Sequence, residues 1–277
     1  MNVADIGKKA GDGRCEKTPG TVYLVGAGPG DADLLTVRAH RLIEQAEVLV
    51  YDRLVAEEIL ELSSQSAVRV FVGKSPSRHT LPQEEINSLL VRLASSGRNV
   101  VRLKGGDPFI FGRGGEEAEE LARAGIPFEV VPGITAASGC LAGLGIPLTH
   151  RGVATGARFV TGHCREGVPL ELNWKSLADP ETTLVIYMGL SNIAIMTEQL
   201  AAAGLSPETP ALAVSSGTTP RQKTCRGTLA TLPEDVERDG LTAPVLIVIG
   251  QVVEAAERSG ISQVLVERAV KEAVPSA

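Results

Sequence analysis

The chain has 277 residues, 43% of them hydrophobic, which is enough for two domains that each bury a core. Its net charge of −6, from 27 Lys plus Arg against 33 Asp plus Glu, comes without a basic tract, so nucleic acid is not an expected partner. The cysteines form no C-x-x-C pair, which removes the spacing signature of a disulfide framework or a zinc site. We therefore expect no bound metal, and reduced cytosolic thiols at Cys15, Cys140, Cys164 and Cys225.

The apolar runs, such as PVLIVIG at 244–250, are much shorter than a membrane span, and residues 1–20 hold no apolar core of signal-peptide length. These features predict a soluble cytoplasmic protein without a membrane partner. They also predict a disordered N-terminal tail over residues 1–19.

Short β-branched runs alternate with amphipathic stretches in the first half of the chain. Strands are predicted over 21–28, 47–52, 68–73, 99–106 and 128–133. Residues 82–97 predict a helix that Gly97 ends, with an apolar stripe of Ile86, Leu89, Leu90 and Leu93. Residues 31–47 predict another, capped by Asp31 or Asp33, with a stripe of Leu35, Ala39, Leu42 and Ala46. The alternation predicts a mostly parallel sheet covered by helices, whose ligands gather at the carboxyl ends of its strands.

After a junction rich in glycine and alanine at 132–147 the pattern starts again. Strands are expected at 157–163, 182–190, 210–216 and 244–253, and a helix at 191–204. We interpret this as a second α/β unit. The expected organisation is an N-terminal α/β domain over 20–135, a C-terminal α/β domain over 136–255 and a surface segment over 256–277.

The first strand runs into the glycine-rich stretch TVYLVGAGPGD at 21–31, which raises the question of a dinucleotide-binding loop. Strand, glycine turn and helix follow in the required order, and Asp52 lies where a ribose-binding acid would stand. Against this, Asp31 replaces the third glycine and would repel a pyrophosphate, and Pro29 has no N–H to donate to an anion. A nicotinamide-binding dehydrogenase or sensor built on this loop stays open as an alternative.

The loop at 102–121 holds two glycine pairs directly after a predicted strand. Gly105 and Gly106 would let a ligand approach the main chain, whereas the simpler interpretation is an Asp-Pro turn at Asp107 before an acidic helix that starts at Glu116. The run Glu117–Glu120 is expected to be a solvated helix face. A later loop, VPGITAASG, offers the Thr135 hydroxyl as a helix cap or as a ligand group.

Several cations lie in or near these loops and would suit a carboxylate-rich ligand if they came together. They are Lys74, Arg78, His79, Arg113, His150 and Arg151.

The order of four long motifs is more informative than any single loop. YLVGAGPGDADLLTVRAHRLIEQAEVLVYDRLV, GGDPFIFGRGGEEAEEL, VVPGITAASGCLAGLGIPLTHR and TLVIYMGL together resemble the uroporphyrinogen-III C-methyltransferases of the tetrapyrrole methylase family, from about residue 21 to about residue 252. The resemblance implies the tetrapyrrole methylase, or class III methyltransferase, fold: two α/β domains with an active-site cleft between them. It also implies a homodimer.

In activity, the resemblance implies S-adenosyl-L-methionine as methyl donor and two methylations of uroporphyrinogen III, at C2 and C7, which give precorrin-2 by way of precorrin-1. Precorrin-2 leads to sirohaem, cobalamin or haem d1. The chain length leaves no room for a fused dehydrogenase and chelatase module, so the reaction is expected to stop at precorrin-2.

Position by position, the resemblance implies a donor site formed by Pro29, Gly105, Gly106, Asp107, Ile110, Thr135, Ala136, Met188, Ala213, Pro244 and Val245. It further implies that Arg113 and Arg151 bind the substrate carboxylates, with Glu116 and Met188 beside the reacting centre. Because a guanidinium stays protonated, we expect Arg113 to act as an anion clamp and Glu116 or a substrate carboxylate to accept the ring proton.

Two points stay open. The loop GKSPSRH departs from the form often seen in these enzymes, which puts the roles of Lys74, Ser75 and Arg78 in doubt. Another methylase of the same fold, acting on a different precorrin or on a substrate that is not a tetrapyrrole, is the nearest alternative. A scaffold without catalytic activity is a further one, which the many glycine-rich loops at strand ends disfavour.

Overall fold

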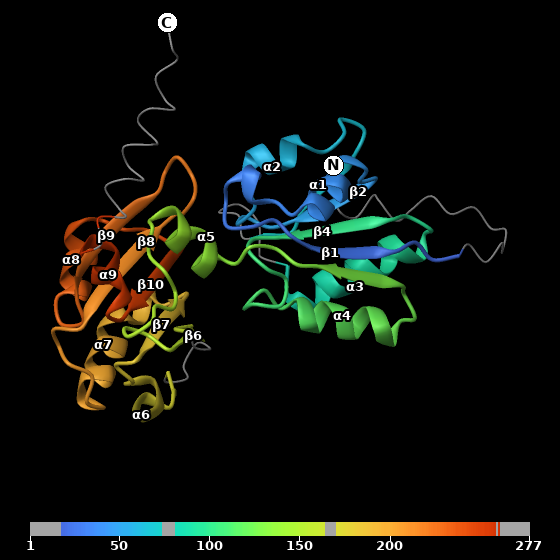
Figure 1. The fold of residues 1–277 in the computed structure, drawn as a ribbon. Helices are drawn as coiled ribbons and strands as arrows, with labels where there is room; N and C mark the ends of the chain where they lie inside the picture. The colour runs from blue at the N-terminus through green and yellow to red at the C-terminus, as the bar shows by residue number, and fades with distance from the viewer. Residues whose placement is uncertain (1–17, 74–80, 164–169, 259, 261–277) are drawn as a thin grey trace, which may run out of the picture. The chain divides into compact units, whose positions relative to one another are not determined.

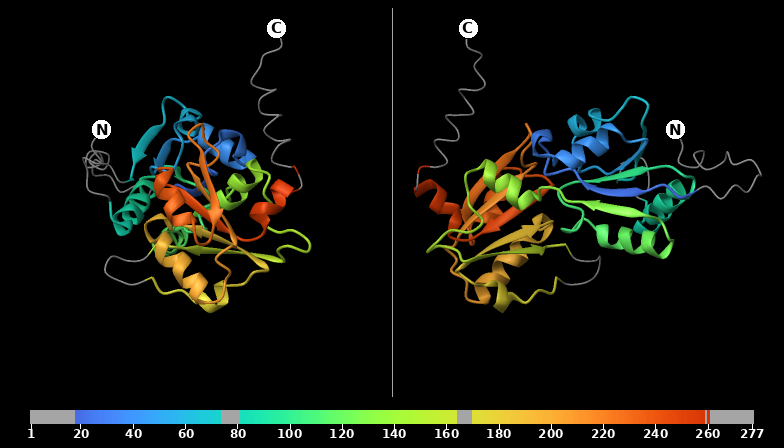
Figure 2. Two further views of the ribbon diagram at one scale, coloured as in Figure 1. Left: turned by 90° about the vertical axis from the view of Figure 1, so that its left-hand side faces the viewer. Right: turned by 45° about the vertical axis from the view of Figure 1, so that its right-hand side comes forward.

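The computed structural model describes residues 18–73, 81–163, 170–258 and 260. The chain divides into two compact units, Met1–Thr135 and Ala136–Ala277, and each has its own sheet and helices (Figures 1 and 2). Most of the expected N-terminal tail and of the expected C-terminal segment lies outside the described residues. The same holds for Cys15, Lys74, Ser75, Arg78, His79 and Cys164.

Unit 1 contains a five-stranded sheet with the order β3-β2-β4-β1-β5. All four pairings are parallel, as the alternation of strands and helices predicts. The carboxyl ends of the strands therefore lie at one edge of the sheet. The strands are β1 (Val22–Gly26), β2 (Val48–Tyr51), β3 (Val68–Phe71), β4 (Val100–Lys104) and β5 (Phe128–Val131).

Helices cover both faces of this sheet (Figure 1). Because side chains alternate along a strand, Leu24 faces the core under α3 (Gln83–Ser95) and α4 (Gly114–Arg123), whereas Val25 faces α1 (Val37–Glu44) and α2 (Glu57–Glu61). The predicted stripe of α3 is confirmed, since all four of its apolar members are buried and Gly97 follows with φ 84°.

The start of α1 differs from the prediction. Asp31 caps a separate 3-10 turn, η2 (Ala32–Leu34), by accepting from the backbone N–H of Asp33. The α-helix begins after Thr36, whose hydroxyl accepts from the N–H of Ala39 at 3.2 Å. A short polar side chain that satisfies a free N–H in this way sets the helix start, and the apolar spacing alone did not locate it.

Unit 2 contains a five-stranded mixed sheet with the order β6-β7-β10-β8-β9. Strands β6 and β7 pair in parallel, whereas β7–β10, β10–β8 and β8–β9 are antiparallel. The link between β8 and β9 spans residues 216–222, which suits a hairpin and is too short for a parallel crossover. The strands are β6 (Gly156–Thr161), β7 (Thr182–Tyr187), β8 (Pro210–Ser215), β9 (Lys223–Thr228) and β10 (Val245–Ile249).

Two apolar layers cover this second sheet. One contains α7 (Ile193–Ala202), α8 (Leu232–Arg238) and the short α6 (Trp174–Leu177), and the other contains α5 (Ala136–Gly143) and α9 (Val252–Arg258). The run expected as one strand at 244–253 is therefore divided between β10 and the start of α9. Among the described helices, none combines the length and apolar character that a membrane crossing requires.

Candidate functional site

Three loops meet at the carboxyl edge of the unit 1 sheet, because they follow the adjacent strands β4, β1 and β5. Gly28 and Gly106 exchange two backbone hydrogen bonds, with N to O distances of 3.2 and 2.6 Å. A Cβ placed on Gly133 would overlap the carbonyl oxygen of Gly106, and a Cβ on Gly26 would crowd the backbone of Gly133. Glycine is required here because the main chains touch each other directly.

The structure around the first glycine loop answers the question whether that loop binds a dinucleotide. The loop leads into the 3-10 turn that Asp31 caps, so no long helix starts there to receive a pyrophosphate. Asp52, the expected ribose-binding acid, is engaged elsewhere: one oxygen accepts from Arg102 Nη2 at 3.2 Å and the other from the N–H of Leu54 at 3.0 Å. The structural requirements of a dinucleotide site are therefore missing at this loop.

Asp107 connects two of the three loops through its side chain. Its Oδ1 accepts from the N–H of Phe109 at 2.8 Å and its Oδ2 from the N–H of Gly133 at 3.1 Å. The backbone N–H of Ile110 donates to the carbonyl of Asp107 at 3.3 Å. The Asp-Pro turn interpretation is thus incomplete, since the carboxylate also fixes the loop after β4 against the loop after β5.

Arg113 is the residue that caps α4, and the helix starts at Gly114, two residues before the predicted start. Its φ of 59° lies in the left-handed region, which residues other than glycine rarely adopt. Residues with such strained backbone conformations are frequent at functional sites. Arg113 Nε and Nη2 donate to Glu116 Oε1 and Oε2 at 2.8 and 2.7 Å, with both side chains about half exposed. These hydrogen bonds raise the pKa of Arg113 above its ordinary value.

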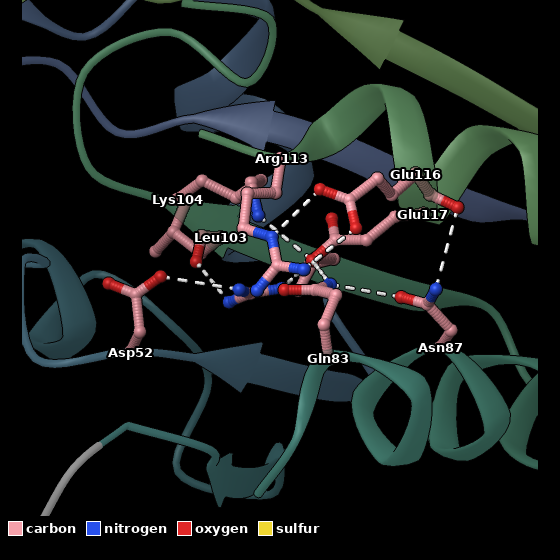
Figure 3. Close-up of polar contacts among 9 residues, drawn as sticks. Asp52, Gln83, Asn87, Leu103, Lys104, Arg113, Glu116 and Glu117 are labelled. Carbon is pink, nitrogen blue, oxygen red and sulfur yellow. Dashed lines mark hydrogen bonds and ion pairs between the residues drawn. The ribbon is translucent and has the colours of Figure 1, made fainter. Parts of the chain in front are cut away.

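Glu117 corrects the prediction of a solvated helix face. Its side chain is fully buried, and its Oε1 accepts from Lys104 Nζ at 2.8 Å and from Arg102 Nε at 3.1 Å (Figure 3). Burial lowers the pKa of Lys104 below its ordinary value. Gly114, Glu117 and Leu121 form the buried line of α4, so the first residue of the Glu117–Glu120 run faces the sheet and not water. Sequence reasoning missed Arg102 and Lys104, although two cations with a spacing of two in an otherwise apolar strand were a usable signal.

Several candidate residues of unit 2, though not Arg151, lie at or near one edge of its sheet. Met188 follows β7, and the register pairs Tyr187 with Leu246 and Val245 with Ser215. The carbonyl of Pro244 accepts from the N–H of Ser216 at 3.0 Å. Met188 has a φ of 54° and a side chain that is 48% exposed.

Two other candidates lie close to this edge. Ala213 is fully buried in β8, opposite Ile247 of β10. Ala136 is the first residue of α5, and the next N–H, of Ala137, donates to the Tyr187 hydroxyl at 3.0 Å. The start of α5 is therefore linked to the end of β7, beside Met188.

Other predicted residues are placed apart. Arg151 is exposed in a turn before β6, whose first residue, Gly156, pairs with Thr182 at the end of β7 opposite to Met188. Its carbonyl contacts Nδ1 of His150 at 3.0 Å. Unit 2 by itself thus does not bring Arg151 beside Met188. Pro29 is half-buried after Gly28, and Thr135 is buried directly before α5.

Neither a metal site nor a disulfide is formed by the parts of the chain that the structure describes. These contain no cluster of three or more His, Cys, Asp and Glu side chains that could hold a metal ion. Cys140 and Cys225 are buried free thiols.

The chain is similar to known proteins over most of its length. Residues 21–233 match the model of the tetrapyrrole (corrin/porphyrin) methylases. A siroheme synthase from Pseudomonas fluorescens (strain Pf0-1) is 58% identical over 247 residues, which are 89% of this chain and 53% of that protein. The chain thus spans about half the length of the curated relatives it matches.

This chain matches a larger share of two solved structures from Thermus thermophilus. The native form of its uroporphyrin III C-methyltransferase is 42% identical, with a TM-score of 0.73 and coverage of 85% of this chain and 100% of that one. A uroporphyrin-III C-methyltransferase of the same organism complexed with S-adenyl homocysteine is 41% identical, with a TM-score of 0.73 and coverage of 85% and 94%. The fold described above and these matches show that the chain belongs to the tetrapyrrole (corrin/porphyrin) methylase family.

Proposed function

We propose that this protein transfers methyl groups from S-adenosyl-L-methionine to C2 and C7 of uroporphyrinogen III, which yields precorrin-2. The observation that carries the proposal is the junction of three glycine-lined loops, one of which leads into the Arg113–Glu116 pair at the start of α4. The similar Thermus thermophilus proteins, one of them complexed with S-adenyl homocysteine, support the choice of donor and acceptor.

The proposed donor residues form two groups, each at one edge of one sheet. In unit 1 they are Pro29, Gly105, Gly106, Asp107, Ile110 and Thr135, and in unit 2 they are Ala136, Met188, Ala213, Pro244 and Val245. The described contacts fit a donor without a phosphate, because these residues offer main-chain N–H and C=O groups and small or apolar side chains. The one carboxylate among them, Asp107, already accepts two backbone hydrogen bonds.

Arg113 is proposed to bind a carboxylate of the tetrapyrrole. Its guanidinium fork matches a carboxylate in a bidentate geometry, as its contact with Glu116 already demonstrates. The guanidinium stays charged throughout the reaction, so it orients the substrate and does not carry a proton. Arg151 is proposed as a second carboxylate-binding cation, and Met188 as an apolar contact beside the reacting centre.

The methyl transfer itself is an in-line displacement by an electron-rich pyrrole carbon. What the protein contributes is alignment of the two reactants and exclusion of water. The methylated carbon carries no hydrogen, so the macrocycle loses a proton from another position, and Glu116 is proposed to accept it once a substrate carboxylate takes its place on Arg113. We also propose a homodimer in the cytoplasm, with precorrin-2 passed on to sirohaem, cobalamin or haem d1 synthesis.

The donor assignment is tested by calorimetric titration with S-adenosyl-L-homocysteine, with NAD and NADP as parallel controls. The proposal predicts binding of S-adenosyl-L-homocysteine at about one site per chain and no heat from either nicotinamide, since Asp31 and Asp52 are committed to structural contacts. Binding of NAD or NADP instead would overturn the assignment.

A further inference from the structure

Three donors converge on a single buried oxygen in unit 1. Glu117 Oε1 accepts from Lys104 Nζ at 2.8 Å, from Arg102 Nε at 3.1 Å and from Gln83 Nε2 at 3.2 Å. Figure 3 shows Glu117 reaching from α4 toward Lys104, with Gln83 and Asn87 approaching from α3. The other oxygen, Oε2, is buried without a hydrogen-bond partner among the described residues. Side chains from two other elements, β4 and α3, therefore hold Glu117 through its Oε1 atom.

The charges of this cluster balance. Two cations, Arg102 and Lys104, face two carboxylates, those of Glu117 and Asp52, and all but Asp52 are almost completely buried. Burying charges costs free energy that their mutual attraction repays only in part, and apolar side chains of similar size often stabilise a fold as well. What a buried ion pair adds beyond apolar packing is a defined position for the groups it joins.

The cluster is continuous with the proposed substrate-binding pair. Glu117 lies in the first turn of α4, and its backbone N–H donates to the carbonyl of Arg113 at 3.3 Å. Asn87 Nδ2 donates to the carbonyl of Glu116 at 3.5 Å and its Oδ1 accepts from Gln83 Nε2 at 2.9 Å. The turn that carries Arg113 and Glu116 is thus tied by polar contacts to both β4 and α3.

We propose that Glu117 is a positioning residue for tetrapyrrole methylation: through Arg102 and Lys104 it fixes the first turn of α4, and with it the Arg113–Glu116 pair. This inference rests on the proposed function, which gives that pair its role toward the substrate. Because the side chain of Glu117 is fully buried, it acts through the backbone of α4. A change that moves this turn misplaces both the clamp and the proton acceptor.

The test compares Glu117→Gln with Glu120→Gln. The first keeps the length of the side chain and removes the buried charge. The second removes the charge of an ion pair on the same helix, Glu120–Arg123, in which the Arg123 side chain is 67% exposed. For each variant, calorimetry with S-adenosyl-L-homocysteine counts the folded donor sites, and steady-state kinetics with uroporphyrinogen III give kcat and KM.

Positioning predicts that Glu117→Gln binds S-adenosyl-L-homocysteine with unchanged stoichiometry, while kcat per site falls about 10- to 100-fold and KM for the tetrapyrrole rises. Glu120→Gln should match the parent in all three values. A merely structural role lowers the number of binding sites in proportion to activity and leaves KM unchanged, and that result would overturn the proposal.

Two additions keep the test decisive. If Glu117→Gln does not fold, the double variant Glu117→Gln/Lys104→Met restores charge balance, with Arg102 left opposite Asp52, and it must still show the low kcat and the raised KM. Parent-like kinetics in this variant would contradict positioning.

Hydrogen exchange of peptides that cover residues 113–118 needs no substrate. Positioning predicts faster exchange in the first turn of α4 for Glu117→Gln and parent-like exchange for Glu120→Gln. This result is expected even if the parent enzyme failed to methylate uroporphyrinogen III. Unchanged exchange would refute the positioning role and would leave the proposed function unaffected.

Discussion

Arg113 and Glu116 hold each other through two nearly equal hydrogen bonds, Nε to Oε1 at 2.8 Å and Nη2 to Oε2 at 2.7 Å. The same fork of donors is what a substrate carboxylate would need. Under the proposed function, a bound tetrapyrrole displaces Glu116 from Arg113. The pair is about half exposed, and an exposed ion pair contributes only about 0–1 kcal/mol. Breaking it therefore costs little free energy.

Replacing Arg113 by Lys should keep the charge and lose the bidentate geometry. We expect kcat/KM for uroporphyrinogen III to fall by about 10- to 100-fold while the affinity for S-adenosyl-L-homocysteine stays the same. Arg123→Lys, an exposed arginine at the other end of α4, is the matched control. Parent-like turnover of Arg113→Lys would rule out the clamp.

Replacing Glu116 by Gln removes the proposed proton acceptor and frees Arg113. We expect kcat to fall by about 100-fold or more and KM to stay level or decrease, because Arg113 no longer has an internal carboxylate to give up. Initial rates across a range of uroporphyrinogen III concentrations separate the two constants. Glu119→Gln, exposed on the same helix, should leave both unchanged. An unaltered kcat in Glu116→Gln would assign the proton to another group.

Replacing Gly133 by Ala should disturb the junction of the three loops, because the added methyl group meets the Gly106 carbonyl. We expect a loss of about 2 kcal/mol in the free energy of unfolding and weaker binding of S-adenosyl-L-homocysteine. Gly143→Ala is the control, since a Cβ there meets no atom within 4 Å. If Gly133→Ala bound the donor product as tightly as the parent, this junction would not belong to the donor site.

The stability of the fold should decrease in alkali through Cys140. Burial raises the pKa of its thiol to about 11, whereas a cysteine in the unfolded chain has a pKa of about 8.5. Between these values the unfolded chain loses the proton and the folded chain keeps it, so the stabilisation is complete below about pH 8.5 and is lost as pH rises toward 11. Denaturant unfolding at several pH values should show an additional decrease of about 1.4 kcal/mol per pH unit in the parent relative to Cys140→Ala. Equal slopes in the two proteins would contradict the raised pKa.

The parallel sheet of unit 1 and the stripe of α3 could be predicted from sequence because they depend on local periodicity. Ile86, Leu89, Leu90 and Leu93 recur at helical spacing, and each is buried. The mixed sheet of unit 2 could not be predicted in the same way. Strand β9 is an edge strand with the sequence KTCRGT, whose polar residues hide its alternation, and without it the hairpin with β8 goes unnoticed.

The acidic run on α4 shows why the polar part of the site was harder to predict. Glu117 and Glu119 are the same residue type two positions apart, yet one is fully buried and the other is exposed. What separates them is a partner far along the chain: Arg102 and Lys104 point from β4 at the position of Glu117. Local charge patterns carry no information on such a partner, whereas the glycine and arginine motifs, matched as whole segments, indicated the family.

Anaerobic incubation of the protein with uroporphyrinogen III and S-adenosyl-L-methionine that carries a labelled methyl group tests the central claim most directly. Mass spectrometry then counts the labels per tetrapyrrole, and nuclear magnetic resonance locates them. The proposed function predicts two labels, at C2 and C7, with one S-adenosyl-L-homocysteine released for each. A tetrapyrrole without label, or with the label on other ring carbons, would contradict it.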